Sequence, residues 1–202
     1  VMATYHQQIY AIDVAVGMIR KALQESGSDK NTVIIYTSDN GFFCGAHGYG
    51  SKVLPYEESS RVPLVIYDPR HRNSGKKFRT SALTGNVDFA PTILRLASLS
   101  VPESMDGKDL MKVYENPEIS NHSYLPLINV WGKAPTHALG IVTEKMKYLY
   151  WGYAGEGFAV AEELYELKKD PMELSNQIGS RTYKQSLKRL RKLYDQQLAH
   201  WK

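Results

Sequence analysis

The chain has 202 residues, of which 43% are hydrophobic and 23% charged, and its formal net charge is +4. These proportions are typical of an ordinary globular protein, and so small a charge does not require a nucleic-acid partner. It suits polyanionic substrates such as sulfated sugars, and equally serves simple solubility. With one cysteine and no apolar run near ~20 residues, the sequence predicts no internal disulfide, no CxxC zinc site and no membrane span.

Residues 3 to about 25 form the first predicted element, an amphipathic helix. Its apolar positions alternate between spacings of three and four residues, and they are Ile9, Ile12, Val16, Ile19 and Leu23. The polar segment 26–29 ends this helix. The apolar, β-branched run 33–37 then predicts a buried strand, and a helix followed by a buried strand is typical of an α/β fold.

The segment after this strand carries the strongest candidate site. Asp39 and Asn40 follow the strand directly, and Lys52 lies thirteen residues beyond Asp39, in a glycine-rich loop that spans residues 41–58. In open α/β sheets, ligands bind in the crevice beyond the carboxyl ends of the strands. A carboxylate and an amide oxygen there can bind a divalent cation, and an ammonium suits a sulfate or phosphate ester. The alternatives are that Asp-Asn-Gly only makes a turn and that Lys52 is a solvated surface cation.

Other residues of the glycine-rich loop are weaker candidates. His47 can hydrogen-bond a substrate or a metal-bound carboxylate, or it can simply pack the loop. Cys44 is more typical of a small apolar filler than of a reactive thiol. We expect Arg61 and either Glu57 or Glu58 to fix the geometry of the loop through hydrogen bonds, without contacting a substrate.

The chain then predicts a second strand, a basic excursion and another helix. The strand covers residues 62–67 and is expected to be buried, and the excursion, residues 68–80, lies on the surface. Asp88 is expected to cap the following helix. Pro91 falls in the first turn of that helix, where its missing N–H group does no harm, and the helix continues to Leu96.

The character of the sequence changes after about residue 101, where proline, glycine and asparagine mark a linker. Short strands are then predicted at 124–130, 138–143, 146–151 and 164–167. Strands so short and closely spaced favour a small antiparallel sheet. A final helix carries one apolar face between Tyr183 and Leu198, opposite a solvated basic face. We therefore divide the chain into an α/β part, residues 1–105, and a smaller subdomain, residues 106–202.

Taken together, the motifs resemble the C-terminal portion of a sulfatase, a family of the alkaline phosphatase superfamily. They occur in the family's order at residues 10–17, 33–41, 47–48, Lys52, 56–58, 61–64, 87–92, 105–107 and 164–171. The resemblance implies the fold class: the C-terminal part of a sulfatase-like α/β sheet domain, followed by a small α+β unit with an antiparallel sheet and a C-terminal helix. Family members often build a substrate-selective rim near Trp131 and His137, although a buried aromatic and a hydrogen-bonded histidine are the simpler interpretation.

The resemblance also implies roles for the candidate residues. Asp39 and Asn40 resemble two of the family's calcium ligands, and Lys52 resembles the lysine that contacts the sulfate group and its leaving oxygen. The nucleophile of the family is a formylglycine made from a Cys/Ser-x-Pro-x-Arg motif, which this sequence lacks, because Cys44 is followed by Gly-Ala-His-Gly. We therefore expect a fragment that begins after the nucleophile, is inactive alone, and has the N-terminal half of the same protein as its partner.

The sequence leads to three functional hypotheses. The first is part of a calcium-dependent sulfatase that hydrolyses the sulfate ester of a small molecule or saccharide, located outside the cytoplasm as the family usually is. The second is a phosphodiester or phosphonate monoester hydrolase of the same superfamily, because these residues do not separate sulfur from phosphorus. The third is an inactive module that binds anionic glycans, for which we expect salt-sensitive binding without a metal requirement.

Overall fold

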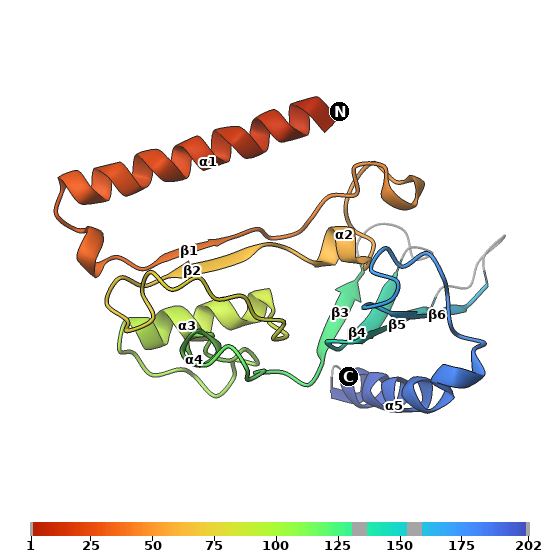
Figure 1. The fold of residues 1–202 in the computed structure, drawn as a ribbon. Coiled ribbons are helices and arrows are strands. Elements are labelled where there is room, and N and C mark those ends of the chain that lie inside the picture. Colours follow the sequence, from red (N-terminus) through yellow and green to blue (C-terminus); the bar gives the residue numbers. More distant parts are fainter. Residues whose placement is uncertain (1, 131–136, 153–158, 201–202) are drawn as a thin grey trace.

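The computed structural model describes residues 2–130, 137–152 and 159–200, and its strands form two separate sheets (Figure 1). The first half contains helices α1 (Met2–Glu25), α2 (Glu57–Ser60), α3 (Phe89–Leu96) and α4 (Met111–Glu115), and strands β1 (Ile34–Thr37) and β2 (Leu64–Tyr67). The second half contains β3 (Leu125–Asn129), β4 (Ala138–Val142), β5 (Met146–Trp151), β6 (Ala161–Glu166) and α5 (Lys184–His200). Short 3₁₀ helices occupy Asp29–Asn31, Ala46–Gly48, Asn86–Asp88 and Arg181–Tyr183. Within the described ranges, no helix combines the length and apolarity that crossing a membrane requires.

In the first half, β1 and β2 form an antiparallel pair, with Thr37 opposite Leu64. Helix α1 lies on one side of this pair and α3 on the other (Figure 1). The predicted first helix is confirmed, but α1 buries none of its residues. Its apolar stripe instead faces β1 and β2 across an apolar cleft of about 420 Å³, to which Ile9 and Ile12 contribute. Because this cleft separates helix from strands, neither strand is buried as predicted: β1 is half-buried, and in β2 half-buried residues alternate with exposed ones.

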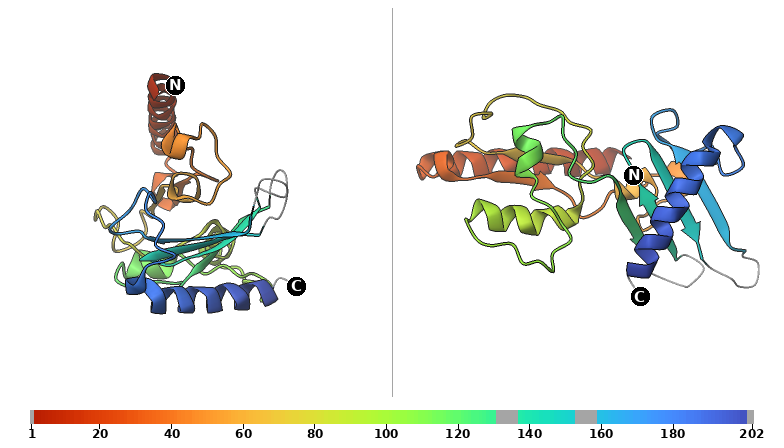
Figure 2. Two further views of the ribbon diagram at one scale, coloured as in Figure 1. Left: turned by 90° about the vertical axis from the view of Figure 1, so that its right-hand side faces the viewer. Right: turned by 90° about the horizontal axis from the view of Figure 1, so that it is seen from below.

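The second half confirms the predicted antiparallel sheet, whose strands follow the order β3-β4-β5-β6. Helix α5 packs across one face of this sheet (Figure 2). The apolar positions of the helix meet those of the strands in a buried core, which contains Ile141, Met146, Tyr148, Leu164, Leu187, Leu190 and Tyr194. Burial of each large side chain here contributes roughly 1.5–3 kcal/mol, so this core is enough to fix the helix on the sheet.

The opposite face of the same sheet packs against the glycine-rich loop. A second buried cluster joins the two, and it contains Phe43, Tyr56, Ala138, Leu149, Trp151 and Tyr165. The hydroxyl of Tyr56 donates to the Glu163 carboxylate on β6, at 3.0 Å from Oε2. Burial, together with that carboxylate, raises the pKa of Tyr56 well above its ordinary range, so its hydroxyl stays a donor. The four-stranded sheet is thus the platform on which the loop carrying Lys52 rests.

Asp88 does not cap α3 as predicted. Its carboxylate is fully buried, and it accepts hydrogen bonds from the backbone N–H groups of Gly85 and Lys108, at 2.9 and 2.7 Å. The Nε2 atom of His122 lies 2.8 Å from the same carboxylate. These partners occupy the oxygens that a cap would have used. They also tie the segment after residue 105 to the first half of the chain, while the domain boundary there stays a prediction.

Candidate active-site rim

The candidate residues Asp39, Asn40 and Lys52 line a single cleft. It opens beyond the carboxyl end of β1, between the start of α1 and the glycine-rich loop, and has a volume of about 720 Å³. Tyr5 of α1 and Phe42 also line it, with their rings stacked at a centroid distance of 6.4 Å. The position beyond a strand end is the one that the sequence predicted for a ligand site.

Within this cleft, the ammonium of Lys52 lies beside both predicted metal ligands. Its Nζ donates to Asn40 Oδ1 at 3.0 Å and lies 4.0 Å from Asp39 Oδ2. The side chains of Lys52 and Asp39 are 49% and 82% exposed. Exposed pairs of this kind contribute at most about 1 kcal/mol, so the lysine is free to exchange these partners for an anionic ligand.

The backbone around these side chains is held firmly. Gly41 donates its N–H to the Ser59 carbonyl at 2.8 Å, and a Cβ atom at position 41 would lie 2.0 Å from the Glu58 carbonyl oxygen, so only glycine fits. Val53, directly after Lys52, has a φ of +105°, which is strained for a β-branched residue. Its N–H donates to the buried Ser59 hydroxyl at 3.1 Å. The turn that follows Lys52 therefore depends on Ser59.

The oxygen atoms of the rim fit a hard cation in chemical type. Calcium takes six to eight oxygen ligands, and it accepts carboxylate and amide oxygens such as those of Asp39 and Asn40. Asp39 is oriented by its neighbours, because its Oδ1 accepts the Asn40 N–H at 2.9 Å and its carbonyl accepts Asn86 Nδ2 at 3.0 Å. Two side chains supply a minority of such a ligand shell.

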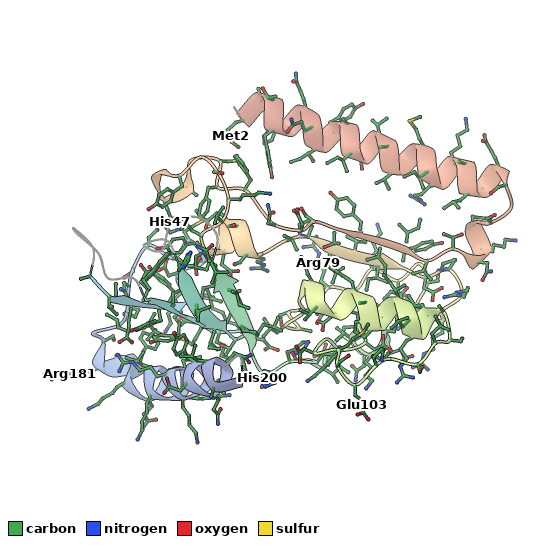
Figure 3. All side chains as sticks on the ribbon, turned by 180° about the vertical axis from the view of Figure 1, so that it is seen from behind. Met2, His47, Arg79, Glu103, Arg181 and His200 are labelled. Carbon is green, nitrogen blue, oxygen red and sulfur yellow. The ribbon has the colours of Figure 1, made fainter. Side chains whose placement is uncertain are left out.

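His47 lies apart from this cleft, although the sequence suggested a role in substrate binding. Its ring stacks on Tyr56 at a centroid distance of 4.4 Å and an interplanar angle of 14°, and its side chain is 12% exposed. The Nε2 atom lies 3.5 Å from Glu58 Oε2 (Figure 3 labels this histidine). Packing against Tyr56 therefore directs His47 toward Glu58, and the structure does not bring it together with Lys52.

The predicted bracing of the loop by Arg61 is marginal, because its side chain is 79% exposed and lies 3.7 Å from Glu57. The main brace was missed by the sequence reasoning. Lys147 of β5 is completely buried, and its Nζ lies 2.8 Å from Glu57 Oε1 and 2.9 Å from Glu173 Oε1. It also donates to the Pro55 carbonyl at 3.0 Å. The sequence feature that could have predicted this brace is a lysine at a buried position of an apolar strand.

The expectations for Cys44, His137 and Trp131 stay predictions. Cys44 is half-buried, with a φ of +51°. His137 lies just before β4, and Trp131 falls outside the described residues.

Comparison with known proteins agrees with this architecture. Residues 45–200 match the family described as N-sulphoglucosamine sulphohydrolase, C-terminal. The chain is 36% identical over 197 residues to an arylsulfatase of Clostridium perfringens, covering 97% of this chain and 40% of the relative. It is 32% identical over 210 residues to an N-acetylglucosamine-6-O-sulfatase of Bacteroides thetaiotaomicron, covering 100% of this chain and 36% of the relative.

The chain also superposes on solved structures of similar proteins. A protein in complex with its substrate D-glucosamine-2-N,6-O-disulfate superposes with a TM-score of 0.80 at 32% identity, covering 94% of this chain and 38% of that one. A phosphonate monoester hydrolase of Agrobacterium radiobacter superposes with a TM-score of 0.77 at 27% identity, covering 95% of this chain and 40% of that one.

The fold and these likenesses identify this chain as a C-terminal portion of the alkaline phosphatase-like class of proteins. The chain belongs to the sulfatase family. It spans about 40% of the length of the relatives that it matches.

Proposed function

We propose that this chain is the C-terminal part of a calcium-dependent sulfatase acting on a sulfated saccharide. The observation that carries the proposal is the convergence of Asp39, Asn40 and Lys52 on one cleft, with the lysine ammonium within 4.0 Å of both oxygen donors. A mobile cation beside two hard oxygen ligands suits a substrate whose reacting group is a sulfate. A sulfated amino sugar is the substrate class we favour, because a curated relative is named for such a sugar and a solved structure holds one as its substrate.

In this proposal, Lys52 acts on the sulfate and on the oxygen of the leaving group. Its ammonium lies beside the charge that develops there as the S–O bond breaks, which lowers the barrier. Asp39 and Asn40 would hold the calcium ion. That ion, when bound, supplies positive charge for the sulfate oxygens. The nucleophile comes from the N-terminal part, as the family resemblance implies.

The exposed apolar surface supports the need for that part. In α1, Ile9 and Ile12 are 49% and 45% exposed, and in β2, Val65 is 57% exposed. Single exposed apolar residues are ordinary, but these three line one apolar cleft. We propose that the N-terminal part of the protein covers this surface and completes the sheet.

The test compares the 202-residue chain with the complete protein, which includes the residues preceding this chain. Arylsulfate hydrolysis is expected from the complete protein only. The substitution Lys52→Ala should lower its turnover by orders of magnitude, whereas Lys188→Ala, on the exposed face of α5, should leave it unchanged. Hydrolysis by the short chain would contradict the fragment proposal, and an unchanged rate in the Lys52 variant would remove this lysine from the mechanism.

A phosphonate monoester hydrolase is the second candidate, and one observation favours it: the superposition with such an enzyme at a TM-score of 0.77. The rim residues suit a phosphoryl group as well as a sulfuryl group, since both present anionic oxygens. A panel of aryl sulfates, phosphonate monoesters and phosphodiesters separates the two. Higher kcat/KM on the phosphorus esters would replace the sulfatase proposal.

A further inference from the structure

A second cluster of metal-binding side chains lies outside the cleft. His47 of the glycine-rich loop, Glu58 of α2 and Glu173, which follows β6, bring one ligand atom each to within 4.8 Å of one another. Three separate segments therefore converge on one point between the loop and the C-terminal sheet. Lys52, Asp39 and Asn40 do not belong to this cluster.

The polar atoms of this cluster are buried without enough partners. His47 Nε2 and both carboxylate oxygens of Glu58 are shielded from solvent and have no hydrogen bond among the described residues. Glu173 is fully buried, and its Oε1 has an ion pair with Lys147 but no well-aligned hydrogen bond. Burying a carboxylate in this way is costly unless a cation or a donor compensates it.

The formal charges of the side chains around this cluster indicate which group compensates the buried carboxylates. Lys147 pairs with Glu57 and Glu173, and Glu58 lies beside Glu173 in the cluster, so three ionised carboxylates and one ammonium give a formal charge of −2 when His47 is neutral. Arg61 lies 3.7 Å from Glu57, but solvent screens most of its charge because its side chain is 79% exposed. One divalent cation beside Glu58 and Glu173 would neutralise the buried charges.

The distance between two of the ligand atoms suits a small transition-metal ion, and all three atoms lie within 4.8 Å of one another. With metal–ligand bonds of about 2.0–2.2 Å, two ligand atoms of a tetrahedral zinc site lie roughly 3.4 Å apart. His47 Nε2 and Glu58 Oε2 lie 3.5 Å apart. Imidazole together with carboxylate is a ligand set that zinc accepts, whereas calcium prefers oxygen alone.

The ligands are also oriented by a second layer of contacts. Tyr56 stacks on the His47 ring and fixes its plane. Glu173 accepts the backbone N–H of Glu57 at its Oε2, at 2.6 Å, and pairs with Lys147 at its Oε1. Outer contacts of this kind are typical of metal sites, where they hold the ligands in place before the ion binds.

We propose that His47, Glu58 and Glu173 bind one divalent transition-metal ion, with zinc as the best fit. This site is distinct from the calcium site of the proposed function. The ion would link the glycine-rich loop and α2 to the C-terminal sheet, and so hold the loop that carries Lys52. The competing arrangement is a protonated His47 paired with Glu58 and no metal.

The experiment measures Zn²⁺ binding to the complete protein, stripped of metal and then kept in excess Ca²⁺ so that hard-oxygen sites are filled. Calorimetry should show one Zn²⁺ per chain, and the thermal midpoint should rise with Zn²⁺. The substitution Glu58→Gln keeps the size of the side chain and should weaken binding at least about tenfold. The matched control is Glu115→Gln, because Glu115 lies 3.9 Å from His71 and this pair has no third metal-ligating side chain nearby among the residues that the structure describes.

If Glu58→Gln fails to fold by circular dichroism, His47→Asn replaces it, because asparagine tolerates the φ of +53° at this position. Equal Zn²⁺ binding by wild type and variant, or no binding by wild type, would overturn the site. Loss of Zn²⁺ binding in Asp39→Asn alone would also overturn it, by moving the metal to the rim. The measurement of Zn²⁺ binding does not depend on catalysis. An absence of sulfatase activity would therefore leave this metal site standing, and an absence of Zn²⁺ binding would leave the proposed sulfatase function standing.

Discussion

The two halves of this chain differ in how completely they bury their apolar side chains. The four-stranded sheet has a buried cluster on each face, one under α5 and one under the glycine-rich loop. The pair of β1 and β2 has an apolar cleft on the side of α1, and α1 buries no residue. The C-terminal unit thus supplies its own core, whereas the first half presents a functional rim on an incompletely covered framework. Three predictions test this difference.

The largest expected effect on stability is at Lys147, where the C-terminal sheet holds the loop. The substitution Lys147→Met leaves Glu57 and Glu173 buried without their cation, and removing one partner of a buried pair costs about 3–5 kcal/mol. Urea unfolding measures the change. The control Lys169→Met removes a lysine whose side chain is 74% exposed, and it should cost far less because solvent screens its ion pair. Equal losses in the two variants would show that Lys147 does not brace the loop.

The second prediction compares the stability cost of removing one apolar side chain from each half of the chain. Leu190 is 2% exposed under the sheet, so Leu190→Ala should lower the free energy of unfolding by about 2–5 kcal/mol. Ile12→Ala in α1 should cost at most about 0.5 kcal/mol in the 202-residue chain, because Ile12 is already exposed. In the complete protein, the proposed covering of α1 predicts a larger cost for Ile12→Ala. A similar small cost in both proteins would argue against that covering.

The smallest effect is a pH dependence in the first half. Asp68 is buried, and Arg70 donates to both of its carboxylate oxygens, at 2.9 and 3.1 Å, which holds the pKa of Asp68 below its ordinary range. Because the folded pKa is lowered, this pair stabilises the fold above about pH 4 and is lost as the pH falls further.

The substitution Asp68→Asn should therefore flatten the acid side of the stability profile, with a loss near neutral pH of about 1 kcal/mol at most, because Arg70 is 40% exposed. Thermal midpoints measured between pH 3 and 7 check this. Burial raises the pKa of Glu173 and acts with the opposite sign, since that group destabilises the fold as the pH rises. An unchanged profile would show that the Asp68 pair does not contribute.

Much of the architecture was predictable because it is local. The strands of the C-terminal sheet follow from short β-branched and aromatic runs, and α5 follows from its apolar spacing. The meeting of Asp39, Asn40 and Lys52 also depends on nearby sequence, since a strand end and one loop bring them together.

The remaining features depend on contacts between distant segments. Glu58, Lys147 and Glu173 are far apart in sequence, and only the packing of the loop on the sheet joins them. Asp88 carries the local pattern of a helix cap, but His122 and the N–H of Lys108 occupy its oxygens instead. The exposure of the apolar face of α1 was not predictable, because an amphipathic pattern shows that a face is apolar, and not that this chain covers it.

The pairing of β1 with β2 has a practical consequence for anyone who produces this chain. Each strand has one neighbour among the described strands, so each presents an outer edge of unpaired backbone N–H and C=O groups. Such edges can recruit strands from other molecules, and the adjoining apolar side chains favour the same association. The 202-residue chain should therefore self-associate as its concentration rises, and adding the proposed N-terminal part in trans should keep it dispersed, which light scattering would measure.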